Sequence, residues 1–241
     1  MTSVDLWWAL RVGIEKILPG HCLHCERRCY KPEWLCEACE EAVERDDCLC
    51  QHSTLHQATL SNCPLCGRGH MAPLMRLHTP LANTGVVQSL IQQWKFQNYP
   101  QLTALLVRLA LSEQGVYRPS PQRRIVPMPM HGWKRYRRGY NQSELLARAL
   151  ARQWRQQGYN ANLDTTALKS RFRITAQHTL NRKQRLAAPA MQFRVCTNVT
   201  NQHFLLVDDV ITTGATLKAA ATALLAAGAA SVSGWCLART P

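Results

Sequence analysis

Apolar and polar positions follow two different periods along the chain after Gly69. Apolar runs over 203–209 and 230–238, and a shorter one over 123–130, predict β-strands. Helical spacing predicts helices over 84–96, 102–115, 141–158 and 217–228, with Asn141 or Ser143 as a cap of the third. Because strand, helix and strand follow one another from 203 to 238, we expect a parallel βαβ unit in an α/β fold. The segment from Lys169 to Phe193 has weak periodicity and predicts a long loop.

The first 18 residues have the pattern of an amphipathic helix. Charges at Asp5, Arg11, Glu15 and Lys16 interrupt it, which excludes a secretory signal or a membrane span. We expect its apolar side to pack against the protein, with peripheral membrane contact as the alternative. That side holds Leu6, Trp7, Leu10, Ile14, Ile17 and Leu18. The chain is therefore predicted to be cytoplasmic, without a transmembrane segment.

Cysteines concentrate near the N-terminus: of the 11 in the chain, all but Cys196 and Cys236 lie between Cys22 and Cys66. Clustered CxxC pairs in a cytosolic chain indicate a metal site. Two knuckles of this kind form a closed cage that suits a structural Zn²⁺. The strongest candidate ligands are Cys22, Cys25, Cys36 and Cys39. A thioredoxin-type dithiol and unliganded structural cysteines are the alternatives, disfavoured by the missing βαβ context and by the number of pairs.

A second zinc cage is a weaker prediction, because a CxC pair makes a poorer knuckle than CxxC. Its ligands would be Cys48, Cys50, Cys63 and Cys66, with His52, His56 and His70 as substitutes. Zinc would fold this segment, since few apolar residues lie between the knuckles. We expect two parts, an N-terminal helix with a zinc-ribbon module over 1–70 and a main domain over 71–241.

The stretch "LLVDDVITTGATL" (205–217) carries the strongest functional signal. Ligands of parallel sheets bind outside the carboxyl ends of the strands, where Asp208 and Asp209 would offer acceptors for sugar hydroxyls. The next loop would open a helix whose N-terminus favours a phosphate. That loop comprises Thr212, Thr213, Gly214, Ala215 and Thr216. The combination suits a ribose 5-phosphate; an ordinary helix cap is the alternative, and Walker A and dinucleotide-binding motifs are absent.

The string "LLVDDVITTGAT" closely resembles the phosphoribosyl pyrophosphate (PRPP) motif of type I phosphoribosyltransferases. Together with the cysteine module, "VPMPMHGWKRYRRGYNQSELLA" and "RITAQHTLNRKQR", it gives the chain a resemblance to the ComF/GntX family over essentially its full length. The resemblance implies a type I phosphoribosyltransferase-like parallel sheet after a zinc ribbon, and phosphoribosyltransferase activity with PRPP and Mg²⁺. It also implies a role in DNA utilisation or competence-type DNA uptake, with uptake-machinery proteins as partners. Ala188 departs from the family pattern, which commonly has Asn three residues after the position of Arg185.

By this resemblance, Asp208 and Asp209 hold the ribose hydroxyls, directly or through Mg²⁺, and the 212–216 loop holds the 5′-phosphate. Basic residues would neutralise the leaving pyrophosphate. The candidates are Lys134, Arg135, Arg137 and Arg138. A solvated basic face and a contact with DNA phosphates are the alternatives for this run.

The charge balance supports a polyanionic partner, because the net charge is +14 and the pI is about 9.6. Trp133, Tyr136 and Tyr140 are interleaved with the four cations of the basic run. Stacking on aromatic rings beside phosphate contacts suits single-stranded DNA, although the rings could equally be packing residues. The second hypothesis is therefore a single-stranded-DNA-binding accessory protein with a vestigial or regulatory phosphoribosyl pocket.

Overall fold

A computed structural model describes residues 20–29, 34–51, 73–97, 99–112, 120, 122–130, 139–171 and 192–241, with only the backbone of 47–51. The expected N-terminal helix lies outside these ranges. The part of the chain that the structure describes contains no helix long and apolar enough to cross a membrane.

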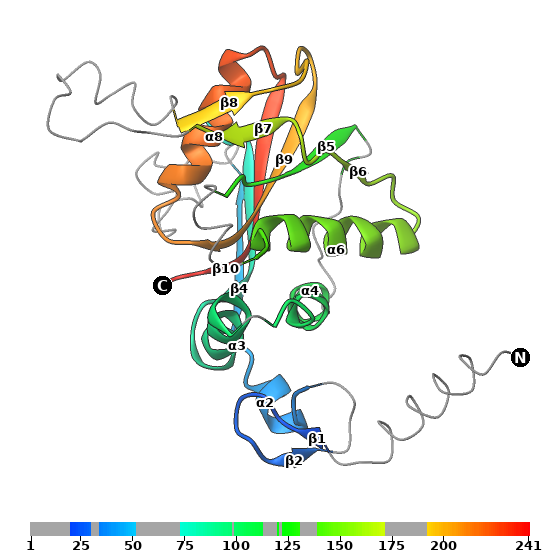
Figure 1. Ribbon diagram of the computed structural model, residues 1–241, viewed down its shortest axis with the longest axis vertical. Coiled ribbons are helices and arrows are strands. Elements are labelled where there is room, and N and C mark those ends of the chain that lie inside the picture. Colours follow the sequence, from blue (N-terminus) through cyan, green and yellow to red (C-terminus); the bar gives the residue numbers. More distant parts are fainter. Residues whose placement is uncertain are drawn as a thin grey trace, which may run out of the picture.

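A six-stranded sheet forms the centre of the molecule, in the order β3-β4-β10-β9-β5-β6 (Figure 1). All neighbouring pairs are parallel except β3 and β4, which pair antiparallel. The strands span Arg45–Gln51 (β3), Arg76–Ala82 (β4), Arg123–Pro127 (β5), Asn162–Leu163 (β6), His203–Ile211 (β9) and Ser231–Arg239 (β10). The predicted strands β5, β9 and β10 are confirmed, and so is the parallel βαβ unit. The pattern analysis missed β3, β4 and β6.

Helices cover both faces of the sheet. α3 (Gly85–Phe96), α4 (Leu102–Leu111) and α6 (Gln142–Gln156) share one core with the β9 residues Leu205 and Val207. α8 (Ala215–Ala226) packs on the other face, against Phe204 and Leu206 of the same strand. This alternation along β9 is what a strand buried on both sides requires. The helices expected from the sequence are present, although α4 ends at Leu111 and does not reach residue 115.

The predicted loop over 169–193 has both of its ends in a small antiparallel pair, β7 (Leu168–Ser170) and β8 (Phe193–Val195). This pair lies beside α8, on the same side of the sheet (Figure 1). Residues 172–191 between the two strands, which include the whole basic motif "RITAQHTLNRKQR", lie outside the described residues.

The first cysteine pairs form a small module of β1 (Gly20–His21), β2 (Arg28–Cys29) and α2 (Glu37–Glu41) below α3 and α4 (Figure 1). Leu35 and Val43 are buried in the core that α3 and α4 share with the sheet. Two polar contacts add to this packing: the Gln93 side-chain amide donates to the Leu23 carbonyl at 2.9 Å, and Arg108 pairs with Glu40 at 2.6 Å. The module is therefore docked on these helices.

The chain then leaves the cysteine module and enters the main sheet through β3. Asp46 on β3 accepts hydrogen bonds from both Arg239 on β10, at 2.6 Å, and Thr79 on β4, at 2.7 Å. The predicted boundary between two domains at residue 70 stays a prediction. However, β3, an edge strand of the main sheet, lies before that position in the sequence.

Candidate functional site

The order of the strands creates a switch point between β5 and β9. From β5 the chain runs through α6 to β6 on one side, and from β9 it runs through α8 to β10 on the other. In open α/β sheets, ligands bind outside the carboxyl ends of two such strands. Asp208 and Asp209 lie near the carboxyl end of β9, which continues two residues further than the sequence predicted.

The two carboxylates are held by different elements. Asp208 Oδ1 accepts a hydrogen bond from Ser143 Oγ on α6 at 2.8 Å and another from the amide of Asp209 at 3.0 Å. Asp209 Oδ2 lies 2.8 Å from Nζ of Lys95 on α3, and its other oxygen accepts the amide of Val210. The pair is therefore fixed by two helices that approach the sheet from the same face.

Burial raises the pKa of Asp208, and the neighbouring charge of Asp209 raises it further. The Ser143 hydroxyl, the Asp209 amide and the Lys95 ammonium oppose this rise, and the pKa settles at about 7. Near neutral pH, Asp208 therefore exchanges a proton easily.

The loop after β9 has the form of an anion cradle. Gly214 has φ 71° and is the N-cap of α8, a left-handed backbone conformation that glycine adopts without strain. No side chain caps this helix, and the closest substitute is a 3.4 Å contact from the Ala215 amide to Thr213 Oγ1. The hydroxyl-bearing residues Thr212, Thr213 and Thr216 are exposed. Amides and hydroxyls are thus available to an anion at a helix N-terminus, beside the two carboxylates.

The described ends of the loop that carries the basic run meet at the carboxyl end of β5. Lys134, Arg135, Arg137 and Arg138 lie outside the described residues, but both ends of their loop are described. Asn141 Nδ2 donates to the Met128 carbonyl at 3.0 Å, which closes the loop at the carboxyl end of β5. Asn141 Oδ1 also accepts the Ser143 amide at 3.2 Å and so caps α6. The loop is therefore anchored next to the carboxylate pair.

The four cysteines Cys22, Cys25, Cys36 and Cys39 come together as predicted. Their sulfur atoms all lie within 4.8 Å of one another, and Cys25 and Cys36 are 3.6 Å apart. Tetrahedral zinc with Zn–S bonds of about 2.3 Å separates its sulfurs by about 3.8 Å, so the cluster fits Zn²⁺. Burial alone would raise the pKa of Cys22, but the amides of Cys25, Cys36 and His24 lower it to about 6. Burial and the sulfurs of Cys36, Cys25 and Cys22 raise the pKa of Cys39, so Cys22 is the first of these two thiols to form the thiolate that binds metal. Of the second predicted cage, Cys63 and Cys66 and the side chains of Cys48 and Cys50 lie outside the described residues.

Comparison with known proteins agrees with this geometry. The model of the phosphoribosyl transferase domain matches residues 141–241, from the start of α6 to the end of the chain. The DNA utilization protein YhgH of Escherichia coli K12 is 36% identical over 234 residues, covering 92% of this chain and 98% of the relative. The chain therefore belongs to the ComF/GntX family. The YhgH of Salmonella typhimurium is also 36% identical, over 231 residues. Competence protein F of Haemophilus influenzae is 32% identical over 155 residues, which cover 62% of this chain and 66% of that protein.

The site prediction missed Ser143 and Lys95, which contact the carboxylates, and also Gln142, which precedes Ser143 in the sequence. The sequence predicts Ser143 only as a helix cap and Lys95 only as part of a helix. Gln142 is fully buried, and neither of its amide atoms has a hydrogen-bond partner among the described residues. Three polar residues in a row, Asn141 to Ser143, exceed what one cap needs, and this was the signal available in the sequence. Nothing in the sequence pointed to Lys95, because its partner is distant along the chain.

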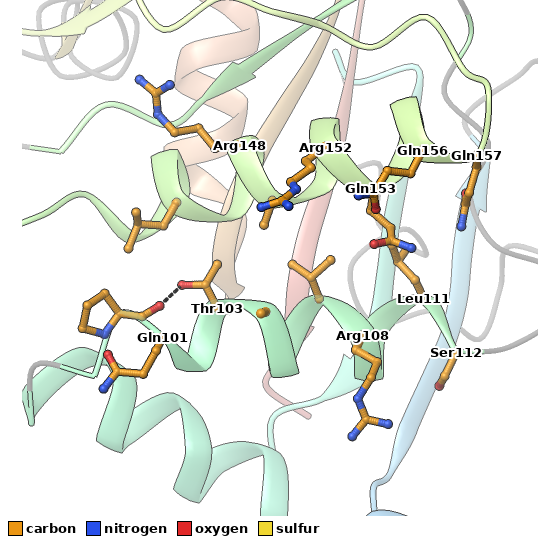
Figure 2. A pocket seen from close by; sticks show the side chains of 15 residues that line it. Gln101, Thr103, Arg108, Leu111, Ser112, Arg148, Arg152, Gln153, Gln156 and Gln157 are labelled. Atoms are coloured by element: carbon orange, nitrogen blue, oxygen red, sulfur yellow. Dashed lines mark hydrogen bonds between the residues drawn. The ribbon is translucent and has the colours of Figure 1, made fainter. Parts of the chain in front are cut away.

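Apart from the carboxylate site, a large groove with a volume of about 740 Å³ lies between α4 and α6 (Figure 2). Its walls carry glutamine and arginine side chains over an apolar floor, and none of the predicted site residues lines it. Arg108 and Arg148 at its rim are paired with Glu40 and Glu144. The carboxylate pair and the anion cradle, which combine donors with acceptors, are therefore the better functional candidate.

Proposed function

We propose that this protein binds PRPP with Mg²⁺ at the carboxyl end of β9 and acts as a phosphoribosyltransferase in the utilisation or uptake of DNA. One observation carries the proposal: two carboxylates at a sheet switch point are followed directly by an uncapped helix N-terminus with exposed hydroxyls. A ribose 5-phosphate needs this combination, since it presents hydroxyls on one side and a phosphate on the other. Membership of the ComF/GntX family and the phosphoribosyl transferase domain support it.

In this proposal, Asp208 and Asp209 hold the 2′ and 3′ hydroxyls of the ribose, and residues 212–216 hold the 5′-phosphate. A nucleophile forms a bond to C1′ while the bond from C1′ to the pyrophosphate oxygen breaks, through an oxocarbenium-like transition state. Fixing the ribose ring at both ends aligns C1′ for this displacement. The cations of the basic loop are the proposed contacts of the leaving pyrophosphate. The hydrogen bond from Asn141 to Met128, which closes that loop beside the carboxylate pair, supports this proposal. Bound with PRPP, Mg²⁺ would screen the charge of the pyrophosphate.

Calorimetric titration of the zinc-loaded protein with PRPP and Mg²⁺ tests the proposal, alongside the Asp209→Asn variant. We expect micromolar binding by the wild type and its loss in the variant. Glu41→Gln is a matched control, because Glu41 is an exposed carboxylate in the cysteine module. Absence of binding by the wild type would leave the motif as a scaffold and contradict the enzymatic function.

Binding of single-stranded DNA is a second candidate function. The net charge of +14 and the anchored basic loop favour it, as do relatives named for DNA utilization and competence. We expect Arg137→Ala with Arg138→Ala to weaken binding of a single-stranded oligonucleotide and to flatten its salt dependence, because two phosphate contacts are lost. Asp209→Asn should leave this affinity unchanged. An oligonucleotide affinity independent of salt would count against a phosphate-tracking loop.

The remaining proposals concern zinc, location and partners. A closed cage of Cys22, Cys25, Cys36 and Cys39 offers no open coordination position, which supports a structural role for its zinc. A second zinc at Cys48, Cys50, Cys63 and Cys66 stays a proposal that metal analysis would test, with two ions per chain expected. Reduced cysteines in a metal-binding arrangement support a cytoplasmic location, and proteins of a DNA-uptake machinery are proposed partners.

A further inference from the structure

The last turn of α3 reaches the candidate site from a part of the chain that the phosphoribosyl transferase domain match leaves out. Lys95, next to the final residue of that helix, places its Nζ 2.8 Å from Asp209 Oδ2. Each of the two side chains is only 17% exposed. An ion pair sheltered to this degree is screened less by water and salt than one on the open surface.

The backbone that carries Lys95 is held on two sides. Trp94 is fully buried, and its indole N–H donates to Thr103 Oγ1 at 3.0 Å. The carbonyl of Trp94 accepts a hydrogen bond from the hydroxyl of Tyr140, at the end of the basic loop. These contacts connect the end of α3 to α4 and to Tyr140, which directly precedes the N-cap of α6. Lys95 is therefore presented by a rigid turn and does not reach the site from a loose surface position.

The charges explain what such a lysine contributes. Two adjacent carboxylates form a site that repels a phosphate ester, and the only cation that the described residues bring into direct contact with this pair is Lys95. Its positive charge offsets part of that repulsion before any substrate arrives. It also contacts Asp209 Oδ2, while Asp209 Oδ1 accepts the amide of Val210, so both oxygens of this carboxylate are held.

We propose that Lys95 is a positioning residue for the sugar-phosphate pocket: it holds the Asp209 carboxylate in place and offsets the charge of the Asp208–Asp209 pair while an anionic sugar phosphate docks. This inference rests on the proposed PRPP-binding function. It extends that function to α3, outside the PRPP motif, and makes the pocket depend on three segments that are distant in sequence. It also separates Lys95 from the cations of the basic loop, which are proposed to contact pyrophosphate directly.

Ribose 5-phosphate is the probe that isolates this role, because it has no pyrophosphate. We would measure its affinity and that of PRPP with Mg²⁺ by calorimetry for the wild type, Lys95→Met, Lys95→Gln and Lys95→Arg. Loss of the charge should weaken both ligands by about tenfold or more, as one unit of log affinity corresponds to about 1.4 kcal/mol. Arginine keeps the charge and should stay within about threefold of the wild type, a rescue that a purely structural role of the side chain does not predict.

The controls separate binding from folding. Lys169→Met removes an exposed lysine on β7 and should change neither affinity. Zinc content and melting temperature identify any variant that fails to fold, and if Lys95→Met fails, the comparison of Gln with Arg decides. Raising the Mg²⁺ concentration should recover part of the PRPP affinity of Lys95→Gln, because another cation then offsets the carboxylates.

Two results would overturn the role of Lys95 while leaving the proposed function intact. One is wild-type affinity of Lys95→Gln for both ligands. The other is a loss confined to PRPP, which would make Lys95 a direct pyrophosphate ligand. If the wild type binds neither ligand, the proposed function fails, and the role of Lys95 fails with it.

Discussion

The cysteine module and the carboxyl end of β9 are both small polar sites, but they are built in different ways. The four sulfurs come from two short segments, and local turns and the start of α2 place them within 4.8 Å of one another. The carboxylate pair depends on Ser143, 65 positions away in the chain, and on Lys95, which is further still. The proposed metal cage would hold its own short segments together, whereas the carboxylates lie on a sheet and helices whose apolar cores pack without them.

This difference determines how each site should respond to mutation of one of its residues. With the proposed zinc bound, loss of one thiolate would open the cage and remove binding energy that supports the fold of the module. Loss of one carboxylate leaves Leu205, Val207 and the rest of the β9 core in place. The first site should therefore fail by unfolding, and the second should fail by losing its ligand.

The largest effect is expected from the cage. Cys39→Ser should remove the zinc and unfold residues 20–44, because structural zinc sites contribute on the order of 10 kcal/mol of apparent binding energy. Metal analysis and limited proteolysis of the module measure this. Cys196→Ser is the matched control, since Cys196 is exposed and lies outside the cluster. A Cys39→Ser protein that resists proteolysis and melts like the wild type would contradict the zinc assignment.

Sequence reasoning reached the two sites to different extents for the same structural reason. The spacing of Cys22, Cys25, Cys36 and Cys39 is local information, so the cluster followed from the sequence. The apolar runs of β9 and β10 also follow from local pattern, because both strands are buried on two sides. Strand β4 was missed since "RLHTPLA" mixes polar residues and a proline, and its place depends on pairing with β3 and β10. Lys95 and Ser143 were missed as site residues because only the folded arrangement brings them to the carboxylates.

The next largest effect concerns the protonation of Asp208, which depends on the surroundings of the β9 site and not on the cysteine module. Burial and the charge of Asp209 raise the pKa of Asp208 to about 7, well above its ordinary value. The folded protein thus holds this proton more tightly than the unfolded chain does. The free energy of unfolding should therefore fall as the pH rises from about 4 to about 7, by at most about 4 kcal/mol at about 1.4 kcal/mol per unit.

Asp208→Asn removes this pH dependence, so its stability relative to the wild type should increase steadily between pH 4 and pH 7. Urea unfolding at several pH values measures the difference. Asp164→Asn is the control: burial raises the pKa of Asp164, but donors from Thr166 and Ala167 lower it below its ordinary value. The contribution of Asp164 is complete above about pH 4 and should stay constant in the same range. Parallel curves for the wild type and Asp208→Asn would refute the raised pKa.

The smallest effect tests how tightly β10 packs against α8, the helix that follows the loop over 212–216. A Cβ added at Gly234 on β10 would lie 2.7 Å from a methyl carbon of Leu217 and 2.9 Å from one of Leu77. Both leucines are almost fully buried, so they have little room to move away. Gly234→Ala should cost about 1–3 kcal/mol, or roughly 2–4 °C of melting temperature per kcal/mol.

Leu217 lies in the first turn of α8, so the displacement caused by Gly234→Ala passes directly to the loop over 212–216. We expect weaker PRPP binding in calorimetry with unchanged zinc content, because the cysteine module lies on the other side of α3 and α4. Ser233→Ala is the control one position earlier: Ser233 is buried and its hydroxyl has no hydrogen-bond partner among the described residues, so its loss should be neutral or stabilising. If Gly234→Ala lowers the zinc content and leaves PRPP binding intact, the two sites are coupled through the sheet and do not fail independently.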